Sequence, residues 1–171
     1  MKPHTFHPDF FKNFCLKKNL LIPCFAIGAI FCLLSCTTID LYEKSITLPR
    51  HQWERNFKPE FDFTIKDSNS LYQLFFILRH NEKYNLNNIY INVYVNGPGE
   101  DSVVKIQKDL VLATNEKGWL ATGMDDIYEH RMALAPAQTL KPGTYHFTIE
   151  QIMREEPLKN VLNAGLRIEK Q

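Results

Sequence analysis

The chain has 171 residues and contains no cysteine after position 36. A domain that begins at Cys36 therefore has a single thiol, and it can form neither an internal disulfide nor a cysteine-based metal site. An excess of charge of one sign is also missing, since 20 Lys and Arg balance 19 Asp and Glu, and this argues against a nucleic-acid-binding protein. Only 7 Gly and 9 Pro are present, too few for a collagen-like or low-complexity chain. A content of 44% apolar residues is too high for a disordered one.

The first 35 residues contain one apolar run, at residues 20–34, which follows two lysines. At 15 residues the run is short for a membrane span, which needs about 20, and Pro23 disfavours a continuous helix there. A charged start, an apolar middle and a small residue at the exit, Ser35, are typical of a secretory signal. We therefore expect residues 1–35 to be a signal peptide and residues 36–171 to be one domain.

The sequence Leu33-Leu34-Ser35-Cys36 resembles a bacterial lipobox. This resemblance implies that a diacylglyceryl group joins the Cys36 sulfur, that a peptidase cuts before Cys36, and that a fatty acid such as palmitate acylates the new amine. The thiol is the nucleophile that this chemistry requires. Two or more acyl chains anchor a protein stably, at about 0.8 kcal/mol per buried CH₂. The alternative is an uncleaved, short membrane helix. Thr37 stands where an Asp often signals inner-membrane retention, so we favour the outer membrane.

The remainder of the chain repeatedly alternates apolar and polar residues, which predicts strands. Turn sequences such as Asn96-Gly97-Pro98-Gly99 and Lys141-Pro142-Gly143 separate these segments. About eight strands punctuated in this way predict an all-β fold, a single antiparallel β-sandwich of immunoglobulin-like or jelly-roll type. A helix at residues 153–161 is a weaker expectation. The predicted strands are 39–44, 61–65, 71–79, 89–95, 103–108 (with a continuation to 113), 128–134, 145–149 and 166–168.

Two surfaces are candidates for contact with a partner. The strand at 71–79 is apolar on both faces, and the face that carries Phe75 and Ile77 needs a cover. That cover is either the segment 45–60 with Trp53 and Phe57, a local helix, or another protein, because large exposed apolar patches usually mark interactions.

The second surface is the face that carries Tyr90, Asn92 and Tyr94. Aromatic rings beside amides suit a sugar or a protein partner. The alternative is an ordinary solvent-facing ladder, since Tyr is favoured in strands.

The sequence indicates no active site, cofactor site or metal site. The histidines that follow Cys36 are not spaced as a local metal pair, and no phosphate loop or nucleophile elbow is present. Asp125-Asp126 and Glu155-Glu156 are adjacent pairs, whose side chains point apart in a strand. A glycosidase pair assembled from distant carboxylates such as Asp67 and Glu150 is the remaining catalytic hypothesis. We therefore expect a protein that is not an enzyme.

Several stretches share an order and a spacing that are specific only when taken together. They are the Cys36 lipobox with Trp53; Leu78-Arg79-His80-Asn81 with Tyr84 and Asn88; Leu112-Ala113, Gly118-Trp119-Leu120, Gly123 and Ile127-Tyr128-Glu129; Pro142-Gly143-Thr144-Tyr145 with Ile149 to Arg154 and Leu158; and Gly165 to Glu169. In these stretches the chain resembles the gliding-motility lipoproteins of the GldH type. Ala121 departs from the pattern, which commonly has a glycine there.

This resemblance implies an anchored structural or interaction component of the gliding machinery, without known catalytic activity. Its partners would be the membrane, through the lipid on Cys36, and other envelope proteins of that machinery. The matched glycines suit turns or close backbone approach. Arg79 and Arg167 would pair with carboxylates or cap a strand. A glycan-binding envelope lipoprotein is the alternative function, and Tyr90 and Tyr94 carry it.

Overall fold

The computed structural model describes residues 41–171. The expected signal peptide, Cys36 and the first residues of the first expected strand lie outside the described residues. Between residues 41 and 171, no helix is long and apolar enough to cross a membrane.

Eight long strands make up most of the described chain, and each corresponds to one of the strands expected from the alternation. The fold is all-β, as predicted. The eight are β1 (Leu41–Thr47), β3 (Glu60–Ile65), β4 (Leu71–Asn81), β5 (Asn88–Asn96), β6 (Val104–Val111), β10 (Ile127–Ala133), β12 (Gly143–Gln151) and β14 (Val161–Lys170).

Six further strands of two or three residues were not predicted from the sequence. They are β2 (Gln52–Trp53), β7 (Ala113–Thr114), β8 (Gly118–Trp119), β9 (Thr122–Met124), β11 (Gln138–Thr139) and β13 (Leu158–Lys159). A single 3₁₀ turn, Pro49–His51, precedes β2. The helix expected at residues 153–161 is wrong, because that segment forms bends, a turn and β13.

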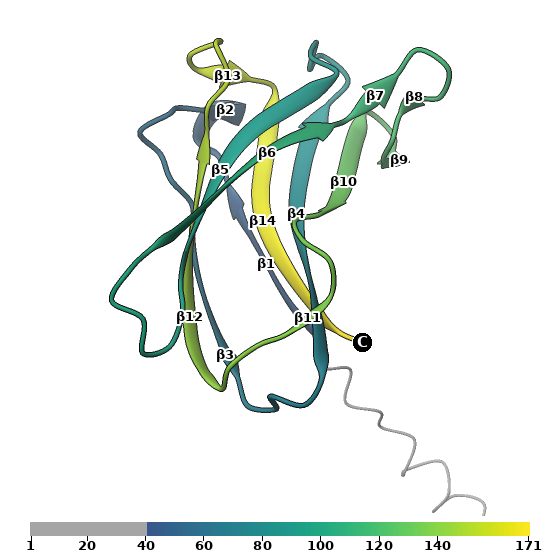
Figure 1. Ribbon diagram of the computed structural model, residues 1–171. Coiled ribbons are helices and arrows are strands. Elements are labelled where there is room, and N and C mark those ends of the chain that lie inside the picture. Colours follow the sequence, from purple (N-terminus) through teal and green to yellow (C-terminus); the bar gives the residue numbers. More distant parts are fainter. Residues whose placement is uncertain (1–40) are drawn as a thin grey trace, which may run out of the picture. The chain divides into compact units, whose positions relative to one another are not determined.

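The strands form two antiparallel sheets that pack as a sandwich (Figure 1). The first sheet has the order β1-β14-β4-β10-β9, and β11 also pairs with β4. The second sheet has the order β3-β12-β5-β6. Two small ribbons, β2 with β13 and β7 with β8, complete the described structure.

The core lies between the sheets and is built by alternation along each long strand. In β4, Leu74, Phe76 and Leu78 point inward and are buried. β5 and β12 contribute their inward-facing apolar side chains in the same way, and burial of each such side chain is worth about 1.5–3 kcal/mol. The core-facing residues of these two strands are Ile89, Ile91, Val93, Tyr145, Phe147 and Ile149.

Trp53 and Phe57 join this core and do not cover the outer face of β4. The Trp53 ring lies 6.3 Å from the ring of Phe76, an inward-facing side chain, and its Nε1 donates a hydrogen bond of 2.8 Å to the Phe57 carbonyl oxygen. The segment 45–60 therefore places its two aromatic side chains between the sheets, and these do not cover Phe75 and Ile77.

Ile77 is fully buried although it points away from the core, whereas Phe75 is half-buried. The residues paired with Ile77 on the neighbouring strands are Gly165 on β14 and Arg131 on β10. A Cβ atom at position 165 would lie 2.4 Å from the Ser45 Oγ and 3.2 Å from the Ile77 Cβ. The missing side chain of Gly165 thus lets Ser45 and Ile77 approach each other over the sheet.

We predict that Gly165→Ala lowers the free energy of unfolding by about 1–3 kcal/mol, the usual cost of overpacking. The new methyl group would also stand 2.9 Å from the Lys44 carbonyl oxygen, a backbone atom that cannot rotate away. Urea denaturation followed by circular dichroism measures the effect. Gly123→Ala is the matched control, since a Cβ there meets only ordinary contacts with Tyr128 at 3.4 Å. Equal stability of the two variants would contradict the packing argument.

Candidate functional site: a groove beside a buried histidine pair

Three short strands shape one end of the first sheet. The chain leaves β6 and forms the β7–β8 ribbon, in which Ala113 is paired with Trp119. It then returns along β9, which pairs with β10 through Met124 and Ile127. The backbone N–H groups of Leu112 and Ala113 both donate to the Asn87 carbonyl oxygen, at 2.8 and 3.0 Å, so the ribbon is fixed to the turn that precedes β5.

Below this ribbon, two histidines from neighbouring strands meet. The Nε2 atoms of His80 on β4 and His130 on β10 lie 2.9 Å apart, and both side chains are fully buried. The His80 Nδ1 lies 2.7 Å from the Asn81 carbonyl oxygen, which only accepts, so this nitrogen carries a proton. In a neutral pair, the Nε2 of His80 then accepts a hydrogen bond from the Nε2 of His130.

Aromatic side chains surround the pair. The ring centroids of Trp119, Tyr84 and Tyr128 lie 4.5, 4.8 and 5.5 Å from that of His80. Burial lowers the pKa of His80. Burial, followed by the proximity of His80, lowers the pKa of His130 to about 4. The pair is therefore neutral at neutral pH and acts as a polar core of the aromatic cluster.

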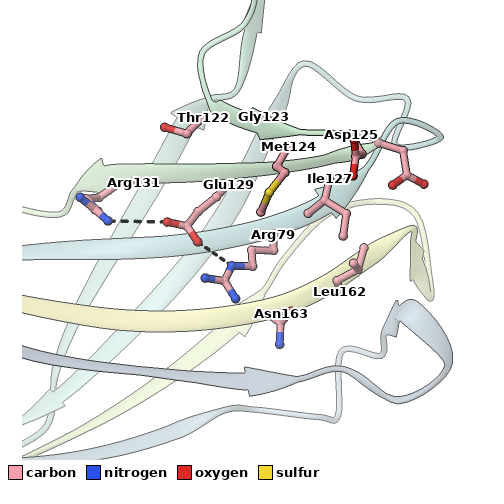
Figure 2. Close-up of a pocket in the computed structure, with 11 residues that line it drawn as sticks. Arg79, Thr122, Gly123, Met124, Asp125, Ile127, Glu129, Arg131, Leu162 and Asn163 are labelled. Atoms are coloured by element: carbon pink, nitrogen blue, oxygen red, sulfur yellow. Dashed lines mark hydrogen bonds and ion pairs between the residues drawn. The ribbon is translucent and has the colours of Figure 1, made fainter.

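The outer side of the same strands carries a groove of about 530 Å³ (Figure 2). Glu129 lies between two arginines, with its Oε2 2.5 Å from the Arg79 Nε and its Oε1 3.6 Å from the Arg131 Nη2. Figure 2 shows Met124 and Ile127 on one side of this charged floor, with Leu162 and Asn163 of β14 on the other. The predicted pairing of Arg79 with a carboxylate is thus present, and Arg167 likewise pairs with Glu43 and Glu169.

Exposed apolar side chains border the groove. Met124 is 77% exposed, and Ile127 and Leu120 are exposed as well. A second hollow of about 330 Å³ shares Thr122, Glu129 and Arg131 with the groove, so the depression continues along β9 and β10. An arginine–carboxylate floor with apolar margins is suited to protein contact.

The geometry does not support a glycosidase pair made of Asp67 and Glu150. Glu150 on β12 contacts Lys58, which precedes β3, whereas Asp67 follows the opposite end of β3. The nine residues of extended chain from Lys58 to Asp67 place Asp67 roughly 30 Å from Glu150. The two catalytic carboxylates of a glycosidase are about 5–10 Å apart. Between residues 41 and 171, no group of three or more His, Cys, Asp or Glu side chains is placed to hold a metal ion.

The five residues predicted as a partner surface lie on two different faces. Phe75 and Ile77 are on the outer face of the first sheet, and Tyr90, Asn92 and Tyr94 are on the outer face of the second. The structure therefore brings together the members of each set but not the two sets.

Glu150 organises the second-sheet face. Its Oε2 accepts hydrogen bonds from the Tyr94 hydroxyl at 2.8 Å and from the Asn92 Nδ2 at 3.1 Å, and its Oε1 lies 2.8 Å from the Lys58 Nζ. The Lys58 contact is the main cause that lowers the pKa of Glu150 to about 2. The polar groups expected to meet a sugar are thus engaged inside the protein, whereas the Tyr90 ring is exposed.

The fold is an all-β sandwich, and sequence comparison supplies the family. Residues 40–168 match the GldH lipoprotein family, and the chain belongs to it. The chain is 25% identical over 145 residues to the gliding motility lipoprotein GldH homolog of Christiangramia forsetii, covering 80% of this chain and 87% of that protein. It is 28% identical over 124 residues to the gliding motility lipoprotein GldH of Flavobacterium johnsoniae, covering 68% and 77%.

These relatives confirm the resemblance noted in the sequence. The family is one of gliding-motility lipoproteins and is not a known enzyme family, and its members are associated with the cell envelope.

Two solved structures are distantly similar. One is a carbohydrate-binding module, CBM28, specific for non-crystalline cellulose, with a TM-score of 0.40 and 12% identity over 74% of this chain and 70% of that chain. The other is a structure of infectious bursal disease virus Gx strain, with a TM-score of 0.25 and 13% identity over 77% and 31%. Both similarities are too remote to bear on function.

We predict that the histidine pair makes the protein less stable as the pH falls from about 6.5 to about 4. The pKa of His130 is lower in the folded chain than in the unfolded chain, so the unfolded chain binds more protons in this window. His130→Gln keeps a donor for His80 but cannot titrate, and we expect its melting temperature to fall less steeply over the same pH range. His51→Gln, at an exposed position, is the control and should keep the wild-type slope. Identical slopes in all three proteins would contradict this assignment.

We predict a second loss of stability at lower pH, caused by Glu150. Its pKa is lower in the folded chain, so its contribution is complete above about pH 4.5 and is lost as the pH falls towards 2. Glu150→Gln is expected to be less stable than wild type at pH 6, with the difference shrinking between pH 4.5 and pH 2. Urea midpoints measured across this range test the assignment, and a difference that does not change with pH would refute it.

Proposed function

We propose that this protein is a lipid-anchored component of the gliding machinery, held in the outer membrane, and that its sandwich domain binds other envelope proteins. The anchor would be a lipid on Cys36, exposed by removal of residues 1–35, and residues 36–171 would form the working domain. Support for the anchor comes from the lipobox sequence and from the lipoprotein family to which the chain belongs.

One observation favours an interaction role at the groove. The stretches around Arg79-His80, Trp119 and Tyr128-Glu129 are separate in sequence, and each resembles the family pattern. In the fold they meet at one end of the first sheet. The inward-facing members build the buried histidine cluster, and Arg79 and Glu129 form the groove floor on the opposite side. A rigid support beneath a shaped surface is what a binding site needs.

The chemistry of the groove favours a protein over a small molecule. Its floor is an arginine–carboxylate network, its margins include the exposed apolar side chains of Met124 and Ile127, and Leu120 lines the adjoining hollow. Protein interfaces combine an apolar centre with arginine anchors in this manner.

Complementation of a motile host that lacks its own copy tests the proposal. We expect Cys36→Ala to abolish surface spreading and to release the protein from the membrane fraction. Met124→Glu introduces a charge at an exposed position of the groove, so the protein is expected to remain folded and anchored. We expect this variant to abolish spreading.

Leu71→Glu is the matched control, since Leu71 is 47% exposed at the opposite end of β4 from the groove. This variant is expected to spread like wild type. Normal spreading by Met124→Glu would reject the groove as the contact site, and normal spreading by Cys36→Ala would reject the anchored role.

A further inference from the structure

β6 is an edge strand of eight residues with one partner. It pairs with β5 from Val95–Val104 to Asn88–Val111, and its other edge has no strand against it in the described chain. Free N–H and C=O groups along such an edge are a template for an added strand, and proteins usually shorten or cover them.

The space beside this edge is apolar. A cavity of about 180 Å³ lies between the sheets, with β5, β6 and β12 on one side and Leu74 and the segment 134–140 on the other. Val104 and Ile106, the inward-facing residues of β6, line it, and Val104 is 49% exposed. Val103, immediately before the strand, is 56% exposed. The cavity therefore reaches the surface along the free edge of β6.

The size of the cavity restricts what can enter. Small-molecule sites measure about 300–1,000 Å³, so this cavity is too small for one. It is suited to one large apolar side chain. Alternate side chains of a strand placed beside β6 would point in the same direction as Val104 and Ile106, and therefore towards the cavity.

The charge on β6 indicates the sign of its partner. Neither Lys105 nor Lys108 makes an ion pair with another described residue, and Lys105 lies over the Tyr94 ring at 5.8 Å. The Asp109 carboxylate accepts a hydrogen bond of 2.8 Å from the Asn88 Nδ2. β6 thus carries two lysines and one carboxylate, which leaves this edge with a net charge of +1.

We propose that β6 binds an extended, acidic segment of a partner protein as an additional strand of the second sheet, with one large apolar side chain of that segment in the cavity. Backbone hydrogen bonds supply the affinity in this mode of recognition, and the pocket and the charges supply the specificity. A second copy of this chain fits less well, because it would bring two basic strands together. The site is separate from the groove and does not depend on it.

The first experiment uses synthetic peptides as probes and the full-length lipoprotein in nanodiscs. One labelled ten-residue peptide alternates Phe or Val with Glu, and a second replaces every Glu by Lys. Fluorescence polarisation is expected to show binding of the acidic peptide and at least about tenfold weaker binding of the basic one. Equal binding of both peptides, or of neither, overturns the proposal.

The second experiment asks whether the peptide pairs as a strand. Two versions of the acidic peptide carry backbone N-methyl groups on alternate residues, one on the odd and one on the even positions. Only one set of N–H groups faces β6 in a strand pair, so one version should lose binding and the other should keep it. Equal effects of the two versions would show that the peptide does not pair with β6.

Variants of the protein locate the site. Lys105→Glu combined with Lys108→Glu is expected to weaken binding of the acidic peptide by about tenfold or more, whereas Lys159→Glu, on the distant β13, leaves it unchanged. Ala135→Leu fills the cavity and is expected to weaken binding without lowering the melting temperature. If the double lysine variant and Ala135→Leu both fold and both bind the acidic peptide as wild type does, the assignment is overturned. A full-length protein that is dimeric until Lys105 and Lys108 are changed makes a second copy the occupant, and this also overturns it.

Discussion

The central constraint in this structure is the position of β4 in the interior of the first sheet. Its two edges pair with β14 and with β10 and β11, its inner face lies in the core, and Ile77 on its outer face is fully buried. A strand that buries apolar residues on both faces reads as a nearly continuous apolar run, and residues 71–78, apart from Gln73, have this character. The sandwich is organised around β4, and the groove and the histidine pair use its final residues, Arg79 and His80.

The inward and outward faces of β4 and β10 have different roles at this end of the first sheet. Residues that point inward, such as His80 and His130, share one hydrogen bond between their Nε2 atoms and are enclosed by aromatic rings. Residues that point outward, Arg79 and Glu129, form the charged floor of the groove. Because successive side chains alternate between faces, one pair of strands holds both the support and the surface. A substitution in the buried histidine pair would therefore shift the backbone of the residues next to it, Arg79 and Arg131.

The sequence was sufficient for the long strands and insufficient for the short ones. Alternation over six or more residues, as in β5 and β12, has a measurable period, whereas two-residue strands such as β7 and β8 have none. The histidine pair was missed because its members are fifty residues apart, and only the register of β4 with β10 brings them together. Trp119 was recognisable as a large anchor, but its place over His80 depends on the β7–β8 ribbon. The groove could not be predicted, since its walls come from β4, β9, β10 and β14.

The position of β14 has a consequence for biogenesis. This strand comes last among the described strands, yet it lies between β1 and β4 and pairs with both over most of its length. Until residues 161–170 are available, the first sheet lacks the strand that joins β1 to β4, and β1 has no neighbour. The first sheet therefore cannot close before these residues are available, and a chain that stopped before residue 161 would leave β1 and β4 without the strand that joins them.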